Sequence, residues 1–329
     1  MIKNNTLLVS IIITTHNRKE KLIRLIESII NSNFPREKME IIVVDNASND
    51  GTYNIIKTRY PYIKIIRIGN NVLPAAARNI GISYSKGKYI FIIDDDNIVS
   101  SDTIGILVDT LEKNPMIGIV APIMYYYQDP NRIWCAGVRR NMVTSITKFV
   151  GNGMIDNGQF KELIESPDFP NAFMVRRAVI EKVGLFDYKL FPIYYEEGDF
   201  GERVRRAGYK VVCNPKAKDW HDIPLPEHEK DKLTLYHLDT PIRVYYYARN
   251  RIIFHAKYSK KWEFLIFLCI FNWIIMSYYM AIILMSKRPW NKRLNLLRSY
   301  LRGVYDGLRY VHYWKSDTSS RDLLLGFQL

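Results

Sequence analysis

The chain has 329 residues, of which 48% are hydrophobic, so it can bury a large core and is too apolar for a disordered tail. Lys and Arg number 47 against 33 Asp and Glu, and the net charge of +14 favours an anionic partner: a nucleic acid, a phosphorylated substrate or a membrane surface. Three widely spaced cysteines argue against a disulfide framework or a zinc site and suit a reducing compartment.

Predicted strands and helices alternate along the first part of the chain. Residues 1–5 lack the sections of a secretory signal, so we expect this part to stay in the cytosol. Continuous apolar, β-branched runs predict strands covered on both faces, and apolar residues at helical spacing predict the helices between them. The strands are expected at 7–14, 40–44, 63–68 and 89–93, and the helices at about 22–30, 52–59 and 75–82. This rhythm is typical of a doubly wound parallel sheet.

Three successive carboxylates, Asp94, Asp95 and Asp96, follow the fourth predicted strand. Residues directly after a strand lie at its carboxyl end, where open α/β sheets bind their ligands. Neighbouring carboxylates repel one another, and a hard cation such as Mg²⁺ or Mn²⁺ would offset that repulsion. Taken alone, the triplet predicts either a divalent metal site or a solvated acidic turn.

The pattern becomes less regular after a helix expected at about 102–113. Shorter strands, at 117–121 and 172–176, are separated by turns rich in Gly and Asn. We expect this stretch to bind an acceptor substrate. Four aromatic residues either form a platform for a sugar ring or belong to the core. They are Tyr125, Tyr126, Tyr127 and Trp134.

A second acidic group begins a helix that we expect at about 197–207. Glu196, Glu197 and Asp199 follow two tyrosines, whereas arginines fill the last turn and Gly208 ends it, in agreement with the helix dipole. One acid here would simply favour the helix N-terminus. Three acids together also fit a general base with a neighbouring hydrogen-bond acceptor.

Two further strands are expected at 209–213 and 216–220, and the second of them leads to His221. A single histidine is usually structural. His221, however, follows a strand in the same way as the aspartates at 94–96 do. It is therefore also a candidate metal ligand.

Five segments up to residue 221 resemble, in order, the inverting family 2 type of nucleotide-sugar glycosyltransferase. They are residues 10–18 (SIIITTHNR), 43–51 (VVDNASNDG), 77–81 (ARNIG), 94–96 (DDD), and 184–187 with 195–200 (GLFD, YEEGDF). Thr14 stands where proline is common in that family, and Glu197 replaces its usual Asp. The resemblance implies the GT-A fold, and the C-terminus resembles that of a rhamnosyltransferase-like subgroup with a membrane-associated tail.

The same resemblance implies roles for individual residues. The implied nucleotide-sugar-binding residues are Thr15, His16, Asn17, Arg18, Asp45, Asn46, Arg78, Asp94 and Asp95. The implied ligands of a Mn²⁺ or Mg²⁺ ion are Asp94, Asp96 and His221. The implied catalytic residues are Glu196, Glu197 and Asp199, with Glu197 as the base that deprotonates an acceptor hydroxyl.

The C-terminal third contains a stretch without charged residues, at 264–285, which is long enough to span a bilayer. A buried core helix is the alternative. Basic residues flank the stretch on both sides, so an interfacial helix or a hairpin within one leaflet is possible beside a simple span. Residues 245–251 are expected where the catalytic domain meets the membrane, and 294–310 as an amphipathic surface helix.

Together these features predict an α/β protein with a doubly wound mixed sheet of the GT-A type and a helical membrane-associated C-terminal region. The expected parts are a catalytic domain at 1–225, a helical linker at 226–261, a transmembrane or interfacial helix at 262–286 and a basic amphipathic tail at 287–329. We expect a metal-dependent glycosyltransferase on the cytoplasmic side of a membrane, which moves a sugar from a nucleotide-diphosphate donor to a hydroxyl of a lipid-linked glycan or surface polysaccharide.

Two alternatives remain open from the sequence. One is a polyprenyl-phosphate glycosyltransferase, whose acceptor is already an anion and needs no base. The other is a non-catalytic basic protein that binds lipid or another polyanion and does not need Asp94, Asp95 or Asp96. No zinc-finger spacing and no RNA-recognition motif supports a nucleic acid partner.

Overall fold

The computed structural model describes residues 7–227 and 231–316. The prediction about the first five residues, and the part of the predicted tail at 317–329, lie outside the described residues. The chain divides into two compact units. The N-terminal unit comprises Met1–Arg139, Lys148–Phe186 and Phe200–Ile223, and the C-terminal unit comprises Arg140–Thr147, Asp187–Asp199 and Pro224–Leu329. Each unit is described by itself.

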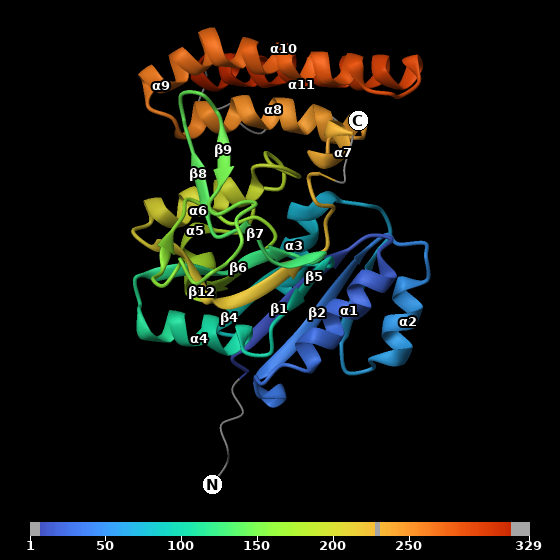
Figure 1. Ribbon diagram of the computed structural model, residues 1–329, viewed down its shortest axis with the longest axis vertical. Coiled ribbons are helices and arrows are strands. Elements are labelled where there is room, and N and C mark those ends of the chain that lie inside the picture. Colours follow the sequence, from blue (N-terminus) through green and yellow to red (C-terminus); the bar gives the residue numbers. More distant parts are fainter. Residues whose placement is uncertain (1–6, 228–230, 317–329) are drawn as a thin grey trace. The chain divides into compact units, whose positions relative to one another are not determined.

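A mixed sheet forms the centre of the N-terminal unit (Figure 1). Its strand order is β10-β12-β6-β11-β4-β1-β2-β3. The four strands that the sequence predicts first are mutually parallel along β4-β1-β2-β3. They are β1 (Val9–Thr15), β2 (Met39–Asn46), β3 (Lys64–Ile68) and β4 (Tyr89–Asp94).

The sheet is parallel over the four strands predicted first and becomes mixed beyond β4. There β11 (Ala172–Arg176) runs antiparallel between β4 and β6 (Ile117–Tyr126). The mixed sheet implied by the family resemblance is confirmed. The remaining strands are β5 (Asn97–Val99), β7 (Asp129–Cys135), β10 (Ile164–Glu165), β12 (Lys210–His221) and a two-stranded ribbon of β8 (Val138–Arg140) and β9 (Thr147–Phe149).

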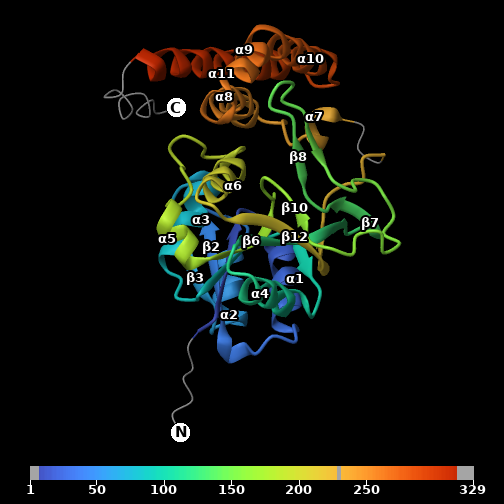
Figure 2. The ribbon, with the colours of Figure 1, turned by 90° about the vertical axis from the view of Figure 1, so that its left-hand side faces the viewer.

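Helices connect and cover the strands of this sheet (Figures 1 and 2). They are α1 (Lys19–Ile30), η1 (Arg36–Lys38), α2 (Thr52–Arg59), α3 (Leu73–Ser83), α4 (Thr103–Lys113) and α5 (Arg177–Val183). The branched residues of the central strands, such as Ile11, Ile42 and Ile92, are almost completely buried. Burial on both faces explains why these strands show continuous apolar runs without alternation.

β12 is a single strand, although the sequence predicted two strands, at 209–213 and 216–220. Its parallel pairing with β6 shifts register between Asn214 and Lys218. A β-bulge of this kind adds residues to one strand without taking that strand out of the sheet. In the sequence, the polar residues at this place resemble a turn, and two strands were therefore predicted. The bulge thus carries the chain onward to His221 without leaving the sheet.

α6 (Glu196–Arg206) begins one residue earlier than predicted and ends one residue earlier. Its first turn belongs to the C-terminal unit and the rest to the N-terminal unit. In the N-terminal unit, Arg203 donates from Nη1 to the Val183 carbonyl at 2.6 Å and from Nη2 to the Leu185 carbonyl at 2.8 Å. Gly201 permits α6 to approach the backbone of Pro167 closely, since a Cβ at position 201 would lie 2.3 Å from the Pro167 carbonyl oxygen.

The C-terminal unit is mainly helical. Its helices are α7 (Lys232–Leu235), α8 (Pro241–Tyr258), α9 (Lys261–Ile266), a π-helical segment (Phe267–Phe271), α10 (Asn272–Met285) and α11 (Trp290–Ser316). α8, α10 and α11 lie side by side (Figures 1 and 2). Gly303 allows α11 to approach α8 closely, because a Cβ at that position would lie 2.3 Å from the Tyr245 carbonyl oxygen. The residues predicted at 245–251 and 294–310 fall within α8 and α11.

Candidate active site

The predicted aspartates lie at the carboxyl ends of neighbouring parallel strands in the N-terminal unit. β4 ends at Asp94, which is in register with Thr14 of β1. Thr15, the last residue of β1, is in register with Asp45 of β2. Three strands therefore deliver polar side chains to one edge of the sheet, where the topology of open α/β sheets places ligands.

The three aspartates have different partners. The Asp94 carboxylate accepts from Arg78 at 2.9 Å. The Asp95 carboxylate accepts from the Thr15 hydroxyl at 2.6 Å and lies 3.1 Å from Arg18 Nη1. The Asp96 carboxylate lies 2.7 Å from the same Arg18 nitrogen. The acidic turn is thus organised by two arginines and is not a solvated loop.

Asp95 and Asp96 are both buried, but the net shifts of their pKa values have opposite directions. Burial raises the pKa of Asp95, and the Arg18 guanidinium offsets only part of this effect. Burial opposes ionisation of Asp96 as well, but His221 and Arg18 hold the pKa of this carboxyl below its usual value. Asp96 is therefore the carboxylate of the pair that keeps its negative charge.

His221, a predicted metal ligand, contacts Asp96. Its Nε2 lies 3.3 Å from an Asp96 carboxylate oxygen, and its ring meets the edge of Trp134 with centroids 4.5 Å apart. The His221 Nδ1 atom is buried and has no hydrogen-bond partner among the described residues. Pairing of β12 with β5 and β6 brings this histidine to the aspartates from the far side of the sheet.

The Asp96 carboxylate and the His221 imidazole provide part of the ligand set that a divalent cation needs. A carboxylate oxygen and an imidazole nitrogen are ligands that Mn²⁺ accepts, and Mg²⁺ prefers oxygen. Within the described ranges, no group of three or more His, Cys, Asp or Glu side chains is arranged to hold a metal ion. Asp94 is engaged with Arg78, so Asp96 and His221 are the predicted metal ligands that the structure brings together.

Asp219 is a residue that the sequence analysis missed. It is completely buried, and neither carboxylate oxygen has a hydrogen-bond partner among the described residues. Burial raises its pKa far above the usual range. The sequence pattern could have indicated Asp219, because it lies on a predicted strand two residues before His221. Residues two apart on a strand face the same side of the sheet.

The loops after β1 and β2 are tied to each other. His16 Nδ1 lies 2.8 Å from the Asn46 carbonyl oxygen, and the Asn17 backbone N–H donates to the Ser48 hydroxyl at 2.9 Å. The Asn46 side chain accepts from the Val72 backbone N–H at 2.9 Å. These polar side chains therefore shape the loops and are already hydrogen-bonded.

Asp45 differs from these loop residues. It is completely buried, and one carboxylate oxygen accepts from the Ser48 backbone N–H at 2.9 Å. Its second oxygen has no hydrogen-bond partner among the described residues. A buried acceptor without a partner is costly, so this oxygen is suited to a donor group of a ligand.

The predicted aromatic platform is largely part of the core. Tyr125 and Tyr126 are buried on β6, so the core alternative holds for them. Tyr127 is 39% exposed, and the Arg24 guanidinium lies 5.2 Å from its ring centroid. Trp134 packs against His221. Of the four, Tyr127 is the one with an exposed ring.

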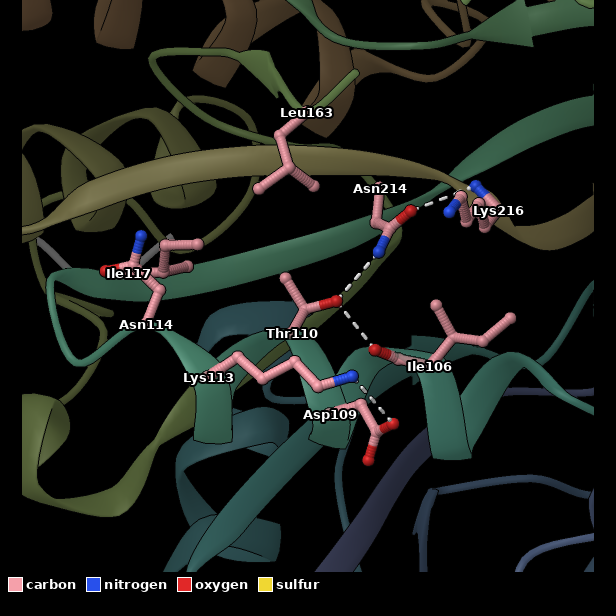
Figure 3. A pocket seen from close by; sticks show the side chains of 9 residues that line it. All are labelled: Ile106, Asp109, Thr110, Lys113, Asn114, Ile117, Leu163, Asn214 and Lys216. Atoms are coloured by element: carbon pink, nitrogen blue, oxygen red, sulfur yellow. Dashed lines mark hydrogen bonds and ion pairs between the residues drawn. The ribbon is translucent and has the colours of Figure 1, made fainter. Parts of the chain in front are cut away.

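A surface pocket of about 360 Å³ lies elsewhere on the N-terminal unit, between α4 and the strands β6 and β12 (Figure 3). Its lining includes Thr110, Asn214 and Lys216, and Asn214 donates to the Thr110 hydroxyl at 2.7 Å. None of the predicted site residues lines it. We therefore place the candidate site at the strand ends and not in this pocket.

The acidic first turn of α6 is held within the C-terminal unit by α8. Tyr194 and Tyr195, just before the turn, both have left-handed backbones, with φ of 61° and 66°. Such conformations are strained for bulky residues and persist only where neighbours hold them. Asn250 of α8 does so, because its amide donates to the Ile193 carbonyl at 2.9 Å and the Tyr194 carbonyl at 3.1 Å.

The three acids of this turn differ in their surroundings. Glu196 is buried and Glu197 is half-buried. One carboxylate oxygen of the fully buried Asp199 accepts from Lys257 Nζ at 2.6 Å and from the Tyr258 hydroxyl at 2.6 Å. A carboxylate paired in this way is better suited to fixing the turn than to removing a proton from a substrate.

The Asp199→Asn variant should be destabilised by about 3 kcal/mol, because breaking a buried ion pair leaves Lys257 without its carboxylate. Urea unfolding followed by circular dichroism measures the change. Lys257→Met should cost a similar amount. The control is Asp109→Asn, which breaks an exposed pair with Lys113 and should cost less than about 1 kcal/mol. A stable but inactive Asp199→Asn protein would contradict the structural role.

Solved structures with the same architecture are glycosyltransferases of the GT-A type. The chain aligns with GalNAc-T7, crystallised with UDP, GalNAc and Mn²⁺, at a TM-score of 0.57 and 19% identity over 87% of this chain and 59% of that chain. It aligns with the mannosyltransferase PcManGT from Pyrobaculum calidifontis, in complex with GDP-Man and Mn²⁺, at a TM-score of 0.56 and 15% identity over 94% of this chain and 88% of that chain. These similarities show the fold.

The sequence profile of glycosyl transferase family 2 matches residues 10–184, more than half of the chain. The chain therefore belongs to glycosyl transferase family 2. The match covers the strand ends with Thr15, Asp45 and Asp96.

The chain is similar to the probable glycosyltransferase YdaM of Bacillus subtilis (strain 168), which is 26% identical over 230 residues that cover 66% of this chain and 51% of YdaM. Glycosyltransferase AglE of Haloferax volcanii is 28% identical over 62% of this chain and 63% of its own length. TarP of Staphylococcus aureus (strain N315), a poly(ribitol-phosphate) beta-N-acetylglucosaminyltransferase, is 35% identical over 28% of this chain and 29% of its own. The chain thus spans about half of YdaM and less than two thirds of AglE.

Proposed function

We propose that the protein is a metal-dependent, inverting glycosyltransferase that moves a sugar from a nucleotide-diphosphate donor to an acceptor hydroxyl. The observation that carries this proposal is the contact of 3.3 Å between Asp96 and His221, at the strand ends where one Asp45 carboxylate oxygen has no partner in the described part of the chain. Family membership supports the reaction class. The UDP, GDP-Man and Mn²⁺ in the two structural neighbours support a donor and a metal of this kind.

Asp45 is the donor-side residue with spare hydrogen-bonding capacity. Its carboxylate oxygen without a partner among the described residues is suited to a donor group of the nucleobase. The family resemblance assigns Asp94 or Asp95 to the ribose hydroxyls. Arg78 would stay with Asp94 and face the nucleotide. The residues His16, Asn17 and Asn46 contribute by holding the loops around it.

Arg18 forms ion pairs with two of the three aspartates. Its guanidinium lies between Asp95 and Asp96 and supplies the positive charge that these carboxylates need. Asp96 and His221 would hold the divalent ion, for which Asp94 is the further candidate ligand. When bound, such an ion neutralises charge on the leaving diphosphate. The Arg18 guanidinium would also suit the donor phosphates, which guanidinium groups bind well.

Glu197 is the proposed base, with Glu196 as its neighbour and Asp199 as the residue that fixes their turn. As the acceptor oxygen bonds to the anomeric carbon, its proton moves to the Glu197 carboxylate. The bond between the anomeric carbon and the diphosphate oxygen breaks, and the diphosphate leaves with the electron pair. Attack from the face opposite the leaving group inverts the configuration.

The proposed acceptor is a lipid-linked glycan or a surface polysaccharide. The poly(ribitol-phosphate) acceptor in the name of TarP supports a polymer of the cell surface. The long apolar helix Lys261–Met285 supports association with a membrane. Because basic residues flank this helix at both ends, we place the catalytic part on the cytoplasmic side of that membrane.

The proposal is tested by thermal shift of the detergent-solubilised protein with UDP, GDP, dTDP and CMP, each with and without Mn²⁺ or Mg²⁺. We expect one nucleotide to raise the melting temperature only with a metal ion, since binding to the folded state stabilises it by about 2.7 kcal/mol at a hundredfold excess over Kd. The stabilising nucleotide identifies the donor class. A folded protein that responds to none of them would favour the non-catalytic alternative.

A further inference from the structure

One helix of the C-terminal unit, formed by α9, the π-helical segment and α10, is long and apolar enough to cross a membrane. It runs from Lys261 to Met285 and is the one candidate span in the described part of the chain. Just 17% of the most apolar 18-residue stretch of this helix is buried, so it is not the core helix of a soluble bundle. Its exposed side chains form what we call the apolar face: Trp262, Leu265, Ile270, Trp273, Ile274, Tyr278, Leu284 and Met285.

The opposite side of this helix is packed within the unit. The Phe267 ring stacks on His255 of α8 with centroids 4.2 Å apart. The Tyr279 and Tyr247 hydroxyl oxygens, from α10 and α8, lie 2.8 Å apart. Asn272 is completely buried on this side. The helix therefore packs beside α8 and α11 (Figures 1 and 2), with one side buried within the unit and the apolar face exposed.

The helices beside it carry charged residues that would follow it into a bilayer. Arg251 of α8 is 1% exposed and donates to the Tyr300 hydroxyl at 2.9 Å. Arg298, Arg302 and Arg309 of α11 are exposed. Ionised side chains are costly in hydrocarbon. A helix that crossed the bilayer in this packing would bring these arginines with it, so the packing favours a helix parallel to the membrane plane.

Basic residues at both ends of the apolar face point to the kind of surface it meets. Lys260 and Lys261 precede it, and Lys287 and Lys292 follow it, all exposed. Such lysines attract anionic lipid headgroups, and exposed tryptophans favour the interface between headgroups and acyl chains. We infer that the C-terminal unit binds an anionic bilayer through the apolar face, with the Lys261–Met285 helix lying in the interface of one leaflet and not spanning it.

This inference concerns an interaction surface and does not depend on sugar transfer. It is tested first by flotation of the full-length protein, after detergent removal, with vesicles of phosphatidylcholine alone or with added phosphatidylglycerol. We expect binding to be at least about tenfold stronger with phosphatidylglycerol and to weaken with salt. The double variant Trp273→Glu, Ile274→Glu should lose binding, because both side chains are exposed on the apolar face.

Met116→Glu is the matched control, since Met116 is 56% exposed but lies in the N-terminal unit. It should bind vesicles like the unsubstituted protein. Equal binding by the double variant, or no binding by the unsubstituted protein, would overturn the inference. Nucleotide-induced thermal shifts of all variants are recorded in parallel, so a failure of the proposed catalytic function is recognised separately.

A second experiment separates an interfacial helix from a span. Cys269 is the exposed cysteine, whereas Cys135 and Cys213 are buried, so Cys269→Ser gives a background without an exposed thiol among the described residues. Lys260→Cys or Lys287→Cys is added to this background, and the protein is bound to the outside of sealed vesicles. A membrane-impermeant maleimide should label both positions without permeabilisation. Labelling of one position only after permeabilisation would show a span and overturn the inference.

Discussion

The Glu197→Gln variant is expected to transfer sugar at least about 100-fold more slowly than the unsubstituted protein, with nucleotide binding unchanged. Glutamine has nearly the same shape but cannot take a proton from the acceptor hydroxyl. Glu197 lies in the first turn of α6 and is half-buried, so the substitution leaves the helix start and the Asp199 contacts in place. Product formation at saturating donor, with binding followed by thermal shift, separates the chemical step from donor affinity.

Glu202→Gln is the control on the same helix, because Glu202 pairs with Arg205 at 2.8 Å away from the acidic turn. It should transfer sugar normally. Glu196→Gln compares the two neighbouring acids directly, and a larger loss there would move the base to Glu196. Full activity of a Glu196, Glu197 double variant would favour transfer to a polyprenyl phosphate, which needs no base.

The Asp96→Ala variant is expected to lose metal-dependent nucleotide binding and to lower turnover by at least about 100-fold. The substitution removes the carboxylate that contacts His221 and leaves Arg18 with Asp95 alone. Without Asp96, the imidazole and the Asp94 carboxylate, which is paired with Arg78, form a weak site for Mn²⁺ or Mg²⁺. Isothermal titration of Mn²⁺ and nucleotide measures both ligands independently of catalysis.

Asp102→Ala removes an exposed carboxylate of the same type, which accepts from Asn33 at 2.6 Å, and serves as the control. Its metal and nucleotide binding should match the unsubstituted protein. Retention of metal-dependent nucleotide binding by a folded Asp96→Ala protein would argue against the proposed metal site. A His221→Ala variant should weaken metal binding in the same direction.

Most of the N-terminal sheet follows from local pattern. The apolar runs before Thr15, Asp45 and Asp94 predict strands, and parallel pairing places their ends together without further information. The antiparallel β11 and the continuous β12 do not follow from it. Their positions depend on pairing between distant strands, and the bulge near Asn214 resembles a turn when read locally.

The candidate site shows the same division between local and distant information. The contact between Asp96 and His221 could be anticipated because both residues follow predicted strands. The partners of Asp199 could not, since Lys257 and Tyr258 lie on a helix more than fifty residues later and no spacing links them to α6. The ion pairs of Arg18 depend on side-chain geometry, which a sequence pattern does not contain.

The dependence of the acidic turn on α8 has a consequence for the order of events during synthesis. The ribosome completes Glu197 well before Asn250 and Lys257, which hold the strained tyrosines and Asp199. Domains fold as their residues emerge. The strands β1 to β4 can therefore assemble early, whereas Glu196 and Glu197, the proposed catalytic acids, gain their final conformation only when α8 has left the exit tunnel. If these residues have the roles proposed above, a nascent chain at that stage holds its donor-binding strand ends before its base is in place.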